Sequence, residues 1–341
     1  MIYRPLVGLR NRHYDRVGRS HRAALPVLSV GNLVVGGTGK TPTVAWIVAR
    51  LLAEGRRPAV VSRGYGGTAG VGPLVVSKGD GPLCTAEQCG DEPWLLARKL
   101  IGACVVVGSD RRRGVERVQQ LGADVVVLDD GFQHRRLARD LDIVLLDAEE
   151  PFGNGRLLPA GPLREPLESL GRAGLVILTR SDPDRDYEEV QQTVRRYQAT
   201  APILRASHRR AGFFDPDGRS APTPSRVVAF CGIAKPDSFR AALEAEGCDV
   251  ARLTARRDHH PYSKSELLEL RRAAESLDAV LVTTEKDLAR LGGRSPFGEG
   301  PRLLVMRIEL LLHDPQPLDD AIAEILSRTG PAPTSGTIEA E

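Results

Sequence analysis

Short apolar runs alternate with helical patterns along the first part of this chain. Runs bounded by Gly, Asp or Ser are typical of buried strands and lie at residues 59–62, 103–107, 124–128, 143–146 and 175–178. This alternation predicts an α/β fold in which a parallel sheet carries helices on both faces. Ligands of such sheets bind at the carboxyl ends of the strands, so the polar residues after each run are the candidates for chemistry.

A second, smaller α/β unit is predicted after a change in composition. Residues 207–225 are rich in Pro, Gly, Ser and Arg, which indicates a linker. Strand and helix patterns resume beyond it and continue to about residue 310. The predicted parts are a basic segment (1–24), a nucleotide-binding domain (25–206), the linker (207–225), a smaller domain that closes the cleft (226–329) and a disordered tail (330–341).

One strand–turn–helix segment carries the clearest chemical signal. An apolar run from Val27 leads into GNLVVGGTGKT, and an amphipathic helix follows Thr41. Glycines let backbone N–H groups face an anion, Lys40 would reach the β- and γ-phosphates of a nucleotide, and the Thr41 hydroxyl would reach Mg²⁺. A glycine-rich turn without a ligand is the alternative. The predicted nucleotide-binding residues are Val34, Val35, Gly36, Gly37, Thr38, Gly39, Lys40 and Thr41.

Acidic pairs stand at two other element ends. Asp129 and Asp130 end an apolar strand, where a P-loop site keeps its Mg²⁺ carboxylate, although an Asp-Gly turn is a common alternative. Asp91 and Glu92 precede an amphipathic helix, where acids suit the positive helix end. A kinase acting on an alcohol also needs a carboxylate that accepts the hydroxyl proton. The adjacent residues His259 and His260 are the other candidates for proton transfer, unless they lie on the surface.

The remaining composition restricts location and partners. The formal net charge of +3 indicates no nucleic-acid partner, and no apolar run approaches the ~18 residues of a membrane-spanning helix. Five scattered cysteines suit free thiols in the cytoplasm. The first 22 residues hold six arginines and one acid, interleaved with apolar residues. Such a segment can lie on a membrane surface or pack on its own domain, and the sequence favours neither.

Several motifs together resemble the tetraacyldisaccharide 4′-kinase family between about residues 25 and 312. They are SVGNLVVGGTGKTP, SRGYGG (62–67), GDEP (90–93), VLDDGFQH (127–134), PFGNGRLLPAGPLREP (151–166), AFCGIAKPDSF (229–239), DHHPYS (258–263) and TTEKD (283–287). The resemblance implies a P-loop kinase that transfers the γ-phosphate of ATP to the 4′-hydroxyl of a tetraacyldisaccharide 1-phosphate. The product would be lipid IV-A of lipid A biosynthesis, made at the cytoplasmic face of the inner membrane.

The resemblance also implies roles for individual residues. Asp91 would be the catalytic base, with His259 or His260 as its partner. The residues around Mg²⁺ would be Thr41, Glu92, Asp129 and Asp130. The acceptor and phosphate cleft would be lined by Arg63, Tyr65, Arg111, Gln133, His134, Arg164 and Glu165. Arginines suit polyanionic substrates. The family begins with a longer apolar helix than the arginine-rich segment found here.

Two other classes of function stay open at this level. TRSD, at residues 179–182, is similar to the guanine-recognition element of GTPases, so a P-loop GTPase or ATPase switch is an alternative. Arg180 stands where that element has lysine, and Val35 stands where partition ATPases have lysine, which argues against both subclasses. A non-enzymatic peripheral membrane protein would leave the aspartates unexplained. The oligomeric state is not determined by these patterns.

Overall fold

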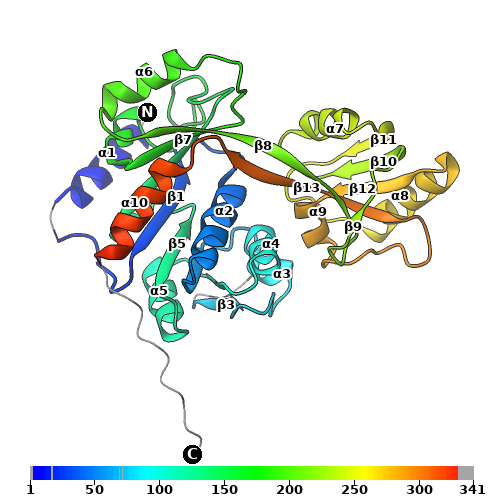
Figure 1. The fold of residues 1–341 in the computed structure, drawn as a ribbon, viewed down its shortest axis with the longest axis horizontal. Coiled ribbons are helices and arrows are strands. Elements are labelled where there is room, and N and C mark those ends of the chain that lie inside the picture. The colour runs from blue at the N-terminus through cyan, green and yellow to red at the C-terminus, as the bar shows by residue number, and fades with distance from the viewer. Residues whose placement is uncertain (1–2, 17, 69, 71, 329–341) are drawn as a thin grey trace, which may run out of the picture.

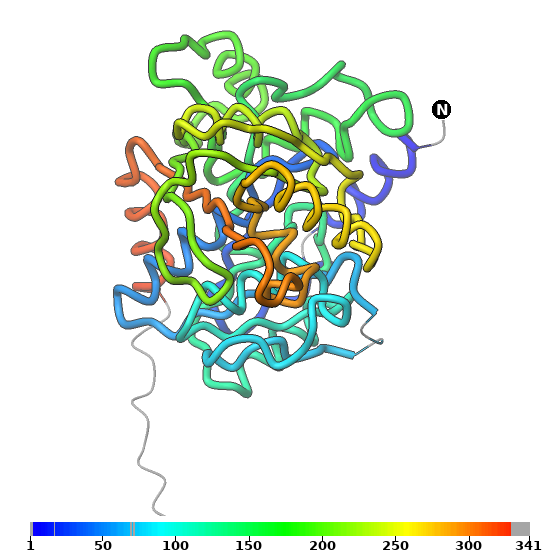
Figure 2. Tube along the Cα trace, turned by 90° about the vertical axis from the view of Figure 1, so that its right-hand side faces the viewer, coloured from blue at the N-terminus to red at the C-terminus, as the bar shows by residue number. Residues whose placement is uncertain are grey.

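The computed structural model describes residues 3–16, 18–68, 70 and 72–328. It consists of two α/β units of unequal size, connected by a long ribbon of two strands (Figure 1). Seen from the side of the smaller unit, this unit lies in front of the larger one (Figure 2). The predicted tail at 330–341 lies outside the described residues.

The larger unit is built on a sheet in the order β7-β6-β1-β5-β2-β4-β3. All neighbours are parallel except β3, which pairs antiparallel with β4 at the sheet edge. Its strands are β1 (Val27–Asn32), β2 (Pro58–Ser62), β3 (Leu74–Ser77), β4 (Cys104–Val107), β5 (Val125–Asp129), β6 (Leu141–Asp147) and β7 (Leu175–Thr179). The five strands predicted from apolar runs correspond to β2, β4, β5, β6 and β7.

Helices cover both faces of this sheet, as the alternation predicts. Ile143 and Leu145 of β6 pack into the core beneath α2 (Lys40–Ala53), α4 (Asp91–Lys99) and α10 (Gln316–Ser327). Val144 and Leu146 face the opposite core, with η1 (Leu167–Arg172) and α6 (Glu188–Tyr197). On the same side, α5 (Arg111–Gln120) packs against β2 and β4. The remaining helices of this unit are α1 (Tyr3–Tyr14) and α3 (Ala86–Cys89).

The smaller unit repeats this arrangement on a shorter scale. Its parallel strands are β11 (Asp249–Ala255), β10 (Arg226–Cys231) and β12 (Val280–Thr284), in that spatial order. One face packs against α7 (Pro236–Ala245), and the other packs against α8 (Lys264–Leu277) and α9 (Glu285–Arg290). The strand and helix patterns predicted beyond residue 225 correspond to these elements.

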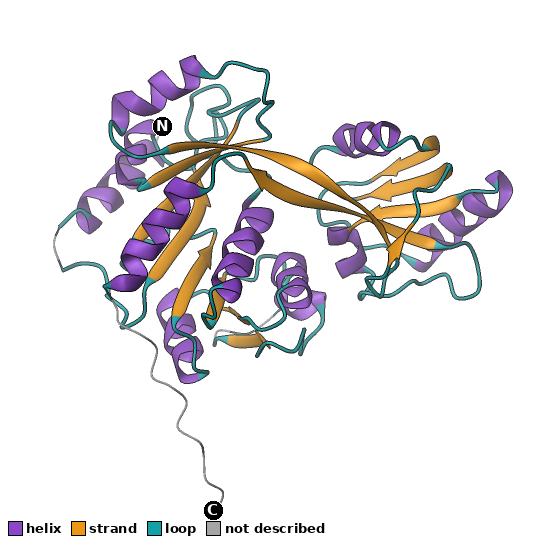
Figure 3. Ribbon diagram, viewed as in Figure 1, coloured by secondary structure: helices purple, strands orange, loops and turns teal. Residues whose placement is uncertain are grey.

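Much of the segment 207–225, which composition predicts to be a linker, forms strands. Residues 207–214 continue β8 (Ile203–Phe214), and β9 (Ser220–Ala221) pairs with its end. The start of β8 extends the larger sheet beside β7, and the rest pairs antiparallel with β13 (Leu303–Leu312). Backbone pairing does not require apolar side chains, so a polar, arginine-rich sequence forms a strand here. The two units therefore share one continuous sheet (Figure 3).

A buried aspartate organises the carboxyl ends of the smaller sheet. Asp287 is fully buried and accepts hydrogen bonds from the Gly232 amide (2.9 Å), the Tyr262 hydroxyl (2.9 Å) and Arg290 (2.8 Å). A further bond comes from the Thr284 hydroxyl at 2.5 Å. One carboxylate thus connects β10, β12, α9 and the loop before α8.

Replacing Asp287 by alanine is therefore expected to destabilise the protein. Removing one member of a buried ion pair leaves the other charge and several donors unsatisfied, which costs about 3 kcal/mol of unfolding free energy or more. Urea unfolding would measure the loss. Asp249→Ala is the matched control, because Asp249 makes an exposed ion pair with Arg226 whose removal costs about 1 kcal/mol or less. Equal unfolding midpoints for the two variants would contradict this role of Asp287.

Candidate active site

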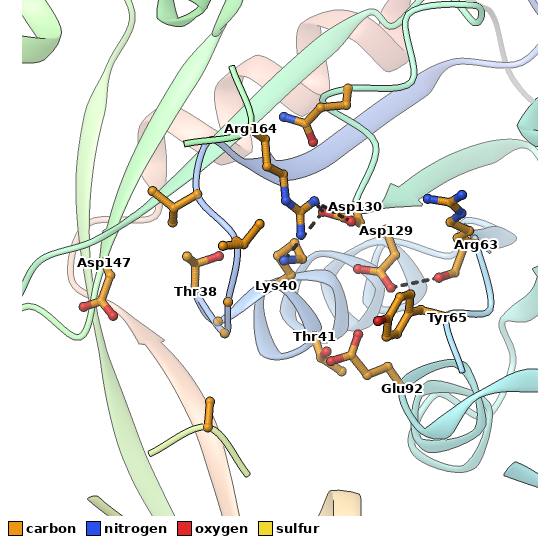
Figure 4. Close-up of a pocket in the computed structure, with 18 of the residues that line it drawn as sticks. Thr38, Lys40, Thr41, Arg63, Tyr65, Glu92, Asp129, Asp130, Asp147 and Arg164 are labelled. Atoms are coloured by element: carbon orange, nitrogen blue, oxygen red, sulfur yellow. Dashed lines mark hydrogen bonds and ion pairs between the residues drawn. The ribbon is translucent and has the colours of Figure 1, made fainter. Parts of the chain in front are cut away.

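A cavity of about 1820 Å³ lies between the two units, at the carboxyl ends of the larger sheet. The loop between β1 and α2, the ends of β5 and β6, and the smaller unit all contribute to its wall. Every site residue predicted from the sequence lines this cavity except Asp91 and His260. Figure 4 shows how Lys40, Asp129, Asp130, Glu92 and Arg164 converge on one region of it.

The glycine-rich loop is fixed by polar residues from neighbouring strands. Asn32, at the end of β1, donates to the Thr38 hydroxyl (2.8 Å), and the Thr179 hydroxyl donates to the Thr38 carbonyl (3.0 Å). Arg180 donates to the Gly37 carbonyl (2.7 Å). Neither Asn32 nor Thr179 is among the residues predicted for the site, although both end a strand at the predicted edge.

Two glycines of the loop adopt the left-handed conformation, Gly36 at φ 119° and Gly39 at φ 83°. This conformation suits glycine and turns successive N–H groups toward one side. Gly39 directly precedes α2, so the positive end of that helix points in the same direction. Val34 is buried, whereas Val35 is 43 % exposed. The loop has the features of an anion-binding site.

Lys40 lies within a small charge network at the start of α2. Its ammonium is 3.5 Å from Asp130 Oδ1 and 3.4 Å from Asn32 Oδ1. Arg164 donates to both oxygens of Asp130, at 3.0 and 2.8 Å. Burial raises the pKa of Asp130, but the charges of Lys40 and Arg164 outweigh it and hold that pKa below its usual range. Asp130 is thus an ionised partner for two cations.

The pKa of Asp129 is shifted in the opposite direction from that of Asp130. The residue is 2 % exposed, and its Oδ2 accepts a hydrogen bond from the Ser62 hydroxyl at 3.0 Å. Burial, followed by the nearby Glu92 carboxylate, raises the pKa of Asp129 to about 6. Its other oxygen, Oδ1, is buried and has no hydrogen-bond partner. A buried carboxylate oxygen without a donor fits a cation.

The oxygen ligands near Asp129 suit Mg²⁺ better than they suit a metal ion that is held by protein side chains alone. Within the described residues, no group of three or more His, Cys, Asp or Glu side chains is arranged to hold a metal ion. Mg²⁺ commonly takes one or two carboxylates and completes its shell with water and phosphate oxygens. Thr41 and Glu92 lie on the same side as Asp129 (Figure 4). Asp130, also predicted as a metal ligand, is engaged by Arg164 and Lys40.

The position of Asp91 resolves the choice between the two histidines. His259 Nδ1 lies 3.0 Å from Asp91 Oδ2, and its ring lies 5.7 Å from the Tyr65 ring. The hydrogen bond to Asp91 raises the pKa of His259. Burial raises the pKa of Asp91, but hydrogen bonds from His259 and Arg290 lower it more. Both shifts favour the charged forms of the two side chains, and their contact joins the two units.

His260 does not take part in this pair. His260 Nε2 lies 2.9 Å from Glu266 Oε1, in the capping box that begins α8, and its ring contacts Tyr262. Of the two histidines predicted as partners of Asp91, the structure therefore places His259, and not His260, beside it. The backbone explains the difference, because His259 has a positive φ of 59° and this turn directs the two consecutive side chains apart.

The residues predicted for the acceptor differ widely in exposure. Tyr65 is 72 % exposed at the rim, whereas Arg111 is 3 % exposed and donates to the Gly108 carbonyl (2.8 Å). Burial lowers the pKa of His134 to about 4, and His134 Nε2 has no partner. Gln133 donates to the Asn32 carbonyl (2.9 Å). Arg63 is exposed at the rim, and Arg164 faces Asp130.

Glu165 borders the cavity but is fully buried. Its Oε2 accepts from Arg172 (2.9 Å), the Ser169 hydroxyl (2.8 Å) and Asn11 of α1 (3.0 Å). The bond from Asn11 attaches α1 to this residue. Contact of Glu165 with the acceptor, which the family resemblance implies, stays a prediction.

Helix α1 packs on the larger unit beside the cavity. Val7 is buried, the Tyr3 hydroxyl donates to the Arg164 carbonyl (2.8 Å), and Arg10 donates to the Gln133 carbonyl (2.5 Å). Leu6 and Leu9 remain 58 % and 67 % exposed. Packing on its own domain, one of the two alternatives for this segment, is thus observed. Across the described part of the chain, no helix has the length and apolar character needed to cross a membrane.

Two lysines of the smaller unit contact the larger one. Lys286 pairs with Glu92, and Lys235 donates to Glu149 (2.8 Å) and Asp147 (3.4 Å). Both lysines stand in motif-like segments of the sequence, which is the only signal that could have indicated a role for them. They contribute positive charge to the cavity on the side opposite the glycine-rich loop.

Comparisons with known proteins agree on one family. Residues 1–327 match the family model described as tetraacyldisaccharide-1-P 4′-kinase. A tetraacyldisaccharide 4′-kinase of Anaeromyxobacter dehalogenans is 46 % identical over 94 % of this chain and 87 % of its own length. The corresponding protein of Pelobacter propionicus is 44 % identical over 92 % and 86 %. A crystal structure of LpxK from Aquifex aeolicus in complex with ATP is 31 % identical, with a TM-score of 0.76 over 95 % and 96 %.

Proposed function

This chain belongs to the tetraacyldisaccharide-1-P 4′-kinase family, and from that premise we propose that it transfers the γ-phosphate of ATP to the 4′-hydroxyl of a tetraacyldisaccharide 1-phosphate. The product is lipid IV-A of lipid A biosynthesis. The observation that carries the proposal is the Asp91–His259 pair: His259 of the smaller unit lines the cavity that also holds Lys40, and its ring contacts Asp91 of the larger unit. A phosphate-binding loop and a positioned carboxylate are what transfer to an alcohol requires.

Different residues in and beside the cavity have different roles in the proposed reaction. Backbone N–H groups of residues 36–41 bind the triphosphate, and the Lys40 ammonium stabilises charge on the phosphoryl group that transfers. Asp91 accepts the proton of the 4′-hydroxyl while His259 holds its carboxylate. Arg63, Arg111 and Arg164 supply positive charge for two polyanionic substrates.

Asp129 and Thr41 are the residues that would hold Mg²⁺, with Glu92 beside them. The unpartnered Oδ1 of Asp129 supports this assignment. Bound Mg²⁺ would neutralise charge on the β- and γ-phosphate oxygens.

The direct test is phosphate transfer measured by mass. Purified protein, Mg²⁺ and ATP are incubated with the tetraacyldisaccharide 1-phosphate in detergent micelles. The expected product carries one additional phosphate. Fragmentation of this product in the mass spectrometer should place the new phosphate at the 4′ position. Slow ATP hydrolysis without any phosphorylated lipid would favour a nucleotide switch instead.

The donor is expected to be ATP rather than GTP. Arg180 stands where guanine recognition uses lysine, and its guanidinium is bound to Asp147 and to the Gly37 carbonyl. It is therefore not available to pack over a guanine base. Initial rates with each nucleotide at equal concentration would measure the preference, and a higher kcat/KM for GTP would contradict it.

We also propose that the protein acts at the cytoplasmic face of the inner membrane, as a peripheral protein. The acceptor is a lipid, and α1 places the exposed Leu6 and Leu9 together with several arginines next to the cavity. Such a helix lies in the interface and does not cross the bilayer.

Membrane association is expected to weaken as salt is added. Arginines near an anionic surface contribute about 1 kcal/mol each at most, and this contribution is screened by ions. Cosedimentation with vesicles containing anionic lipid, at low and high NaCl, would show partial release. Leu6→Ser/Leu9→Ser should release the protein further, because the apolar contribution is unaffected by screening. Binding that ignores both salt and these substitutions would contradict the proposal.

A further inference from the structure

Arg290, the last residue of α9, makes contacts that neither the motifs nor the proposed reaction explain. Its side chain is only 5 % exposed, whereas that of His259 is 35 % exposed. Its Nε donates to Asp91 Oδ2 at 2.7 Å, and one terminal nitrogen donates to the Gly232 carbonyl (2.5 Å) and to Asp287 (2.8 Å). The other terminal nitrogen lies 3.5 Å from Asp258 Oδ1. A guanidinium offers donors in fixed directions, so these partners hold one another in place.

Asp91 receives two donors on the same oxygen. Both His259 and Arg290 bind Oδ2, while Oδ1 accepts no hydrogen bond from any described residue. Two donors on one oxygen fix the plane of the carboxylate and leave the other oxygen available. Arg290 also faces Asp258, whose carboxylate accepts the His259 amide at 3.0 Å. It therefore supports both members of the Asp91–His259 pair.

The hydrogen bond between Arg290 and Asp91 joins the two units. Asp91 begins α4 of the larger unit, whereas Arg290 is anchored in the smaller unit through the fully buried Asp287. Of the two side chains that bind Asp91 from the smaller unit, the arginine is the more buried and has more partners there. Arg98 offers a comparison, since it also connects α4 to the smaller unit, through the Gly293 carbonyl (2.9 Å) and the Pro216 carbonyl, without touching Asp91.

We infer that Arg290 is a positioning residue of the phosphotransfer site, which holds Asp91 Oδ2 so that Oδ1 faces the acceptor hydroxyl when the two units meet. This inference rests on the proposed function, because it assigns Arg290 to the carboxylate that accepts the proton. The two arginines that connect the units then have different roles. Arg290 orients the catalytic base, whereas Arg98 only joins the two surfaces.

The test compares Arg290→Ala, Arg290→Lys and Arg98→Ala in the full-length protein, with kcat and the KM for ATP as readouts. Arg290→Ala is expected to lower kcat by about tenfold or more with little change in KM, because a misplaced catalytic group is costly. Arg290→Lys should lose less of the rate than Arg290→Ala, since it keeps a positive charge near Asp91 but not the fixed donors of the guanidinium. Added guanidinium should partly restore Arg290→Ala. Arg98→Ala should keep kcat near that of the unaltered protein and should not respond to guanidinium.

A double-mutant cycle with Asp91→Asn gives the second readout. If Arg290 acts through Asp91, Arg290→Ala should reduce kcat far less in the Asp91→Asn background than alone. Multiplicative losses, or equal losses in Arg290→Ala and Arg98→Ala, would overturn the inference. A full rate for Asp91→Asn would overturn the proposed base itself. A strong loss in Asp91→Asn with a normal Arg290→Ala would overturn only the role of Arg290. Arg290→Lys keeps the test usable if the loss of a partner for buried Asp287 unfolds Arg290→Ala.

Discussion

Lys40→Ala is expected to abolish phosphate transfer while the protein remains folded. Lys40 is the first residue of α2, and its ammonium has Asn32 and Asp130 as its nearest partners. During transfer the same ammonium would stabilise charge on the phosphoryl oxygens. Removing one such preorganised group typically costs about 100- to 1000-fold in kcat. Asp130 keeps Arg164 as a partner, so the substitution leaves no unpaired carboxylate.

The measurement is kcat/KM with ATP and the disaccharide 1-phosphate, together with a thermal unfolding curve. Lys264→Ala is the matched control, because Lys264 begins α8 with an exposed side chain far from the glycine-rich loop along the chain. We expect its activity to equal that of the unaltered protein. A folded Lys40→Ala protein with near-normal turnover would disprove the phosphate-binding role of the loop.

Asp91→Asn is expected to lower kcat with little effect on ATP affinity. An alcohol is a poor nucleophile at neutral pH, and a positioned base contributes about 10²- to 10⁴-fold. Asparagine keeps the size of the side chain and an oxygen for His259 and Arg290 but cannot take up the proton. Glu87→Gln, an exposed change four residues earlier, is the control for altering charge near α4.

His259 should act as a unit with Asp91. The loss of kcat in Asp91→Asn/His259→Gln should be much smaller than the product of the single losses. His260→Gln should have little effect on kcat, because His260 is bound to Glu266. If Asp91→Asn instead raises the KM for ATP at unchanged kcat, Asp91 belongs to the metal site, and the base would be sought at Asp129 or Asp130.

Features set by neighbouring residues in the chain could be predicted without the structure. The strand, the glycine-rich turn and the helix beginning at Lys40 follow one another within a short segment, and their geometry depends on local conformational preferences. The same holds for Asp129 at the end of β5. The apolar runs also predicted the parallel sheet, because strands buried on both faces must be apolar throughout. The family motifs then indicated which side chains share one cavity.

Tertiary structure alone decided which of these residues interact. His259 and Arg290 are 168 and 199 positions from Asp91, and no local pattern records a contact over such a separation. The choice between His259 and His260 depends on one left-handed backbone conformation. Strand β8 was missed because it is stabilised by pairing with β13, about a hundred residues later, and not by an apolar pattern of its own. The composition of one segment cannot show this pairing, because the pairing depends on two segments that lie far apart in the sequence.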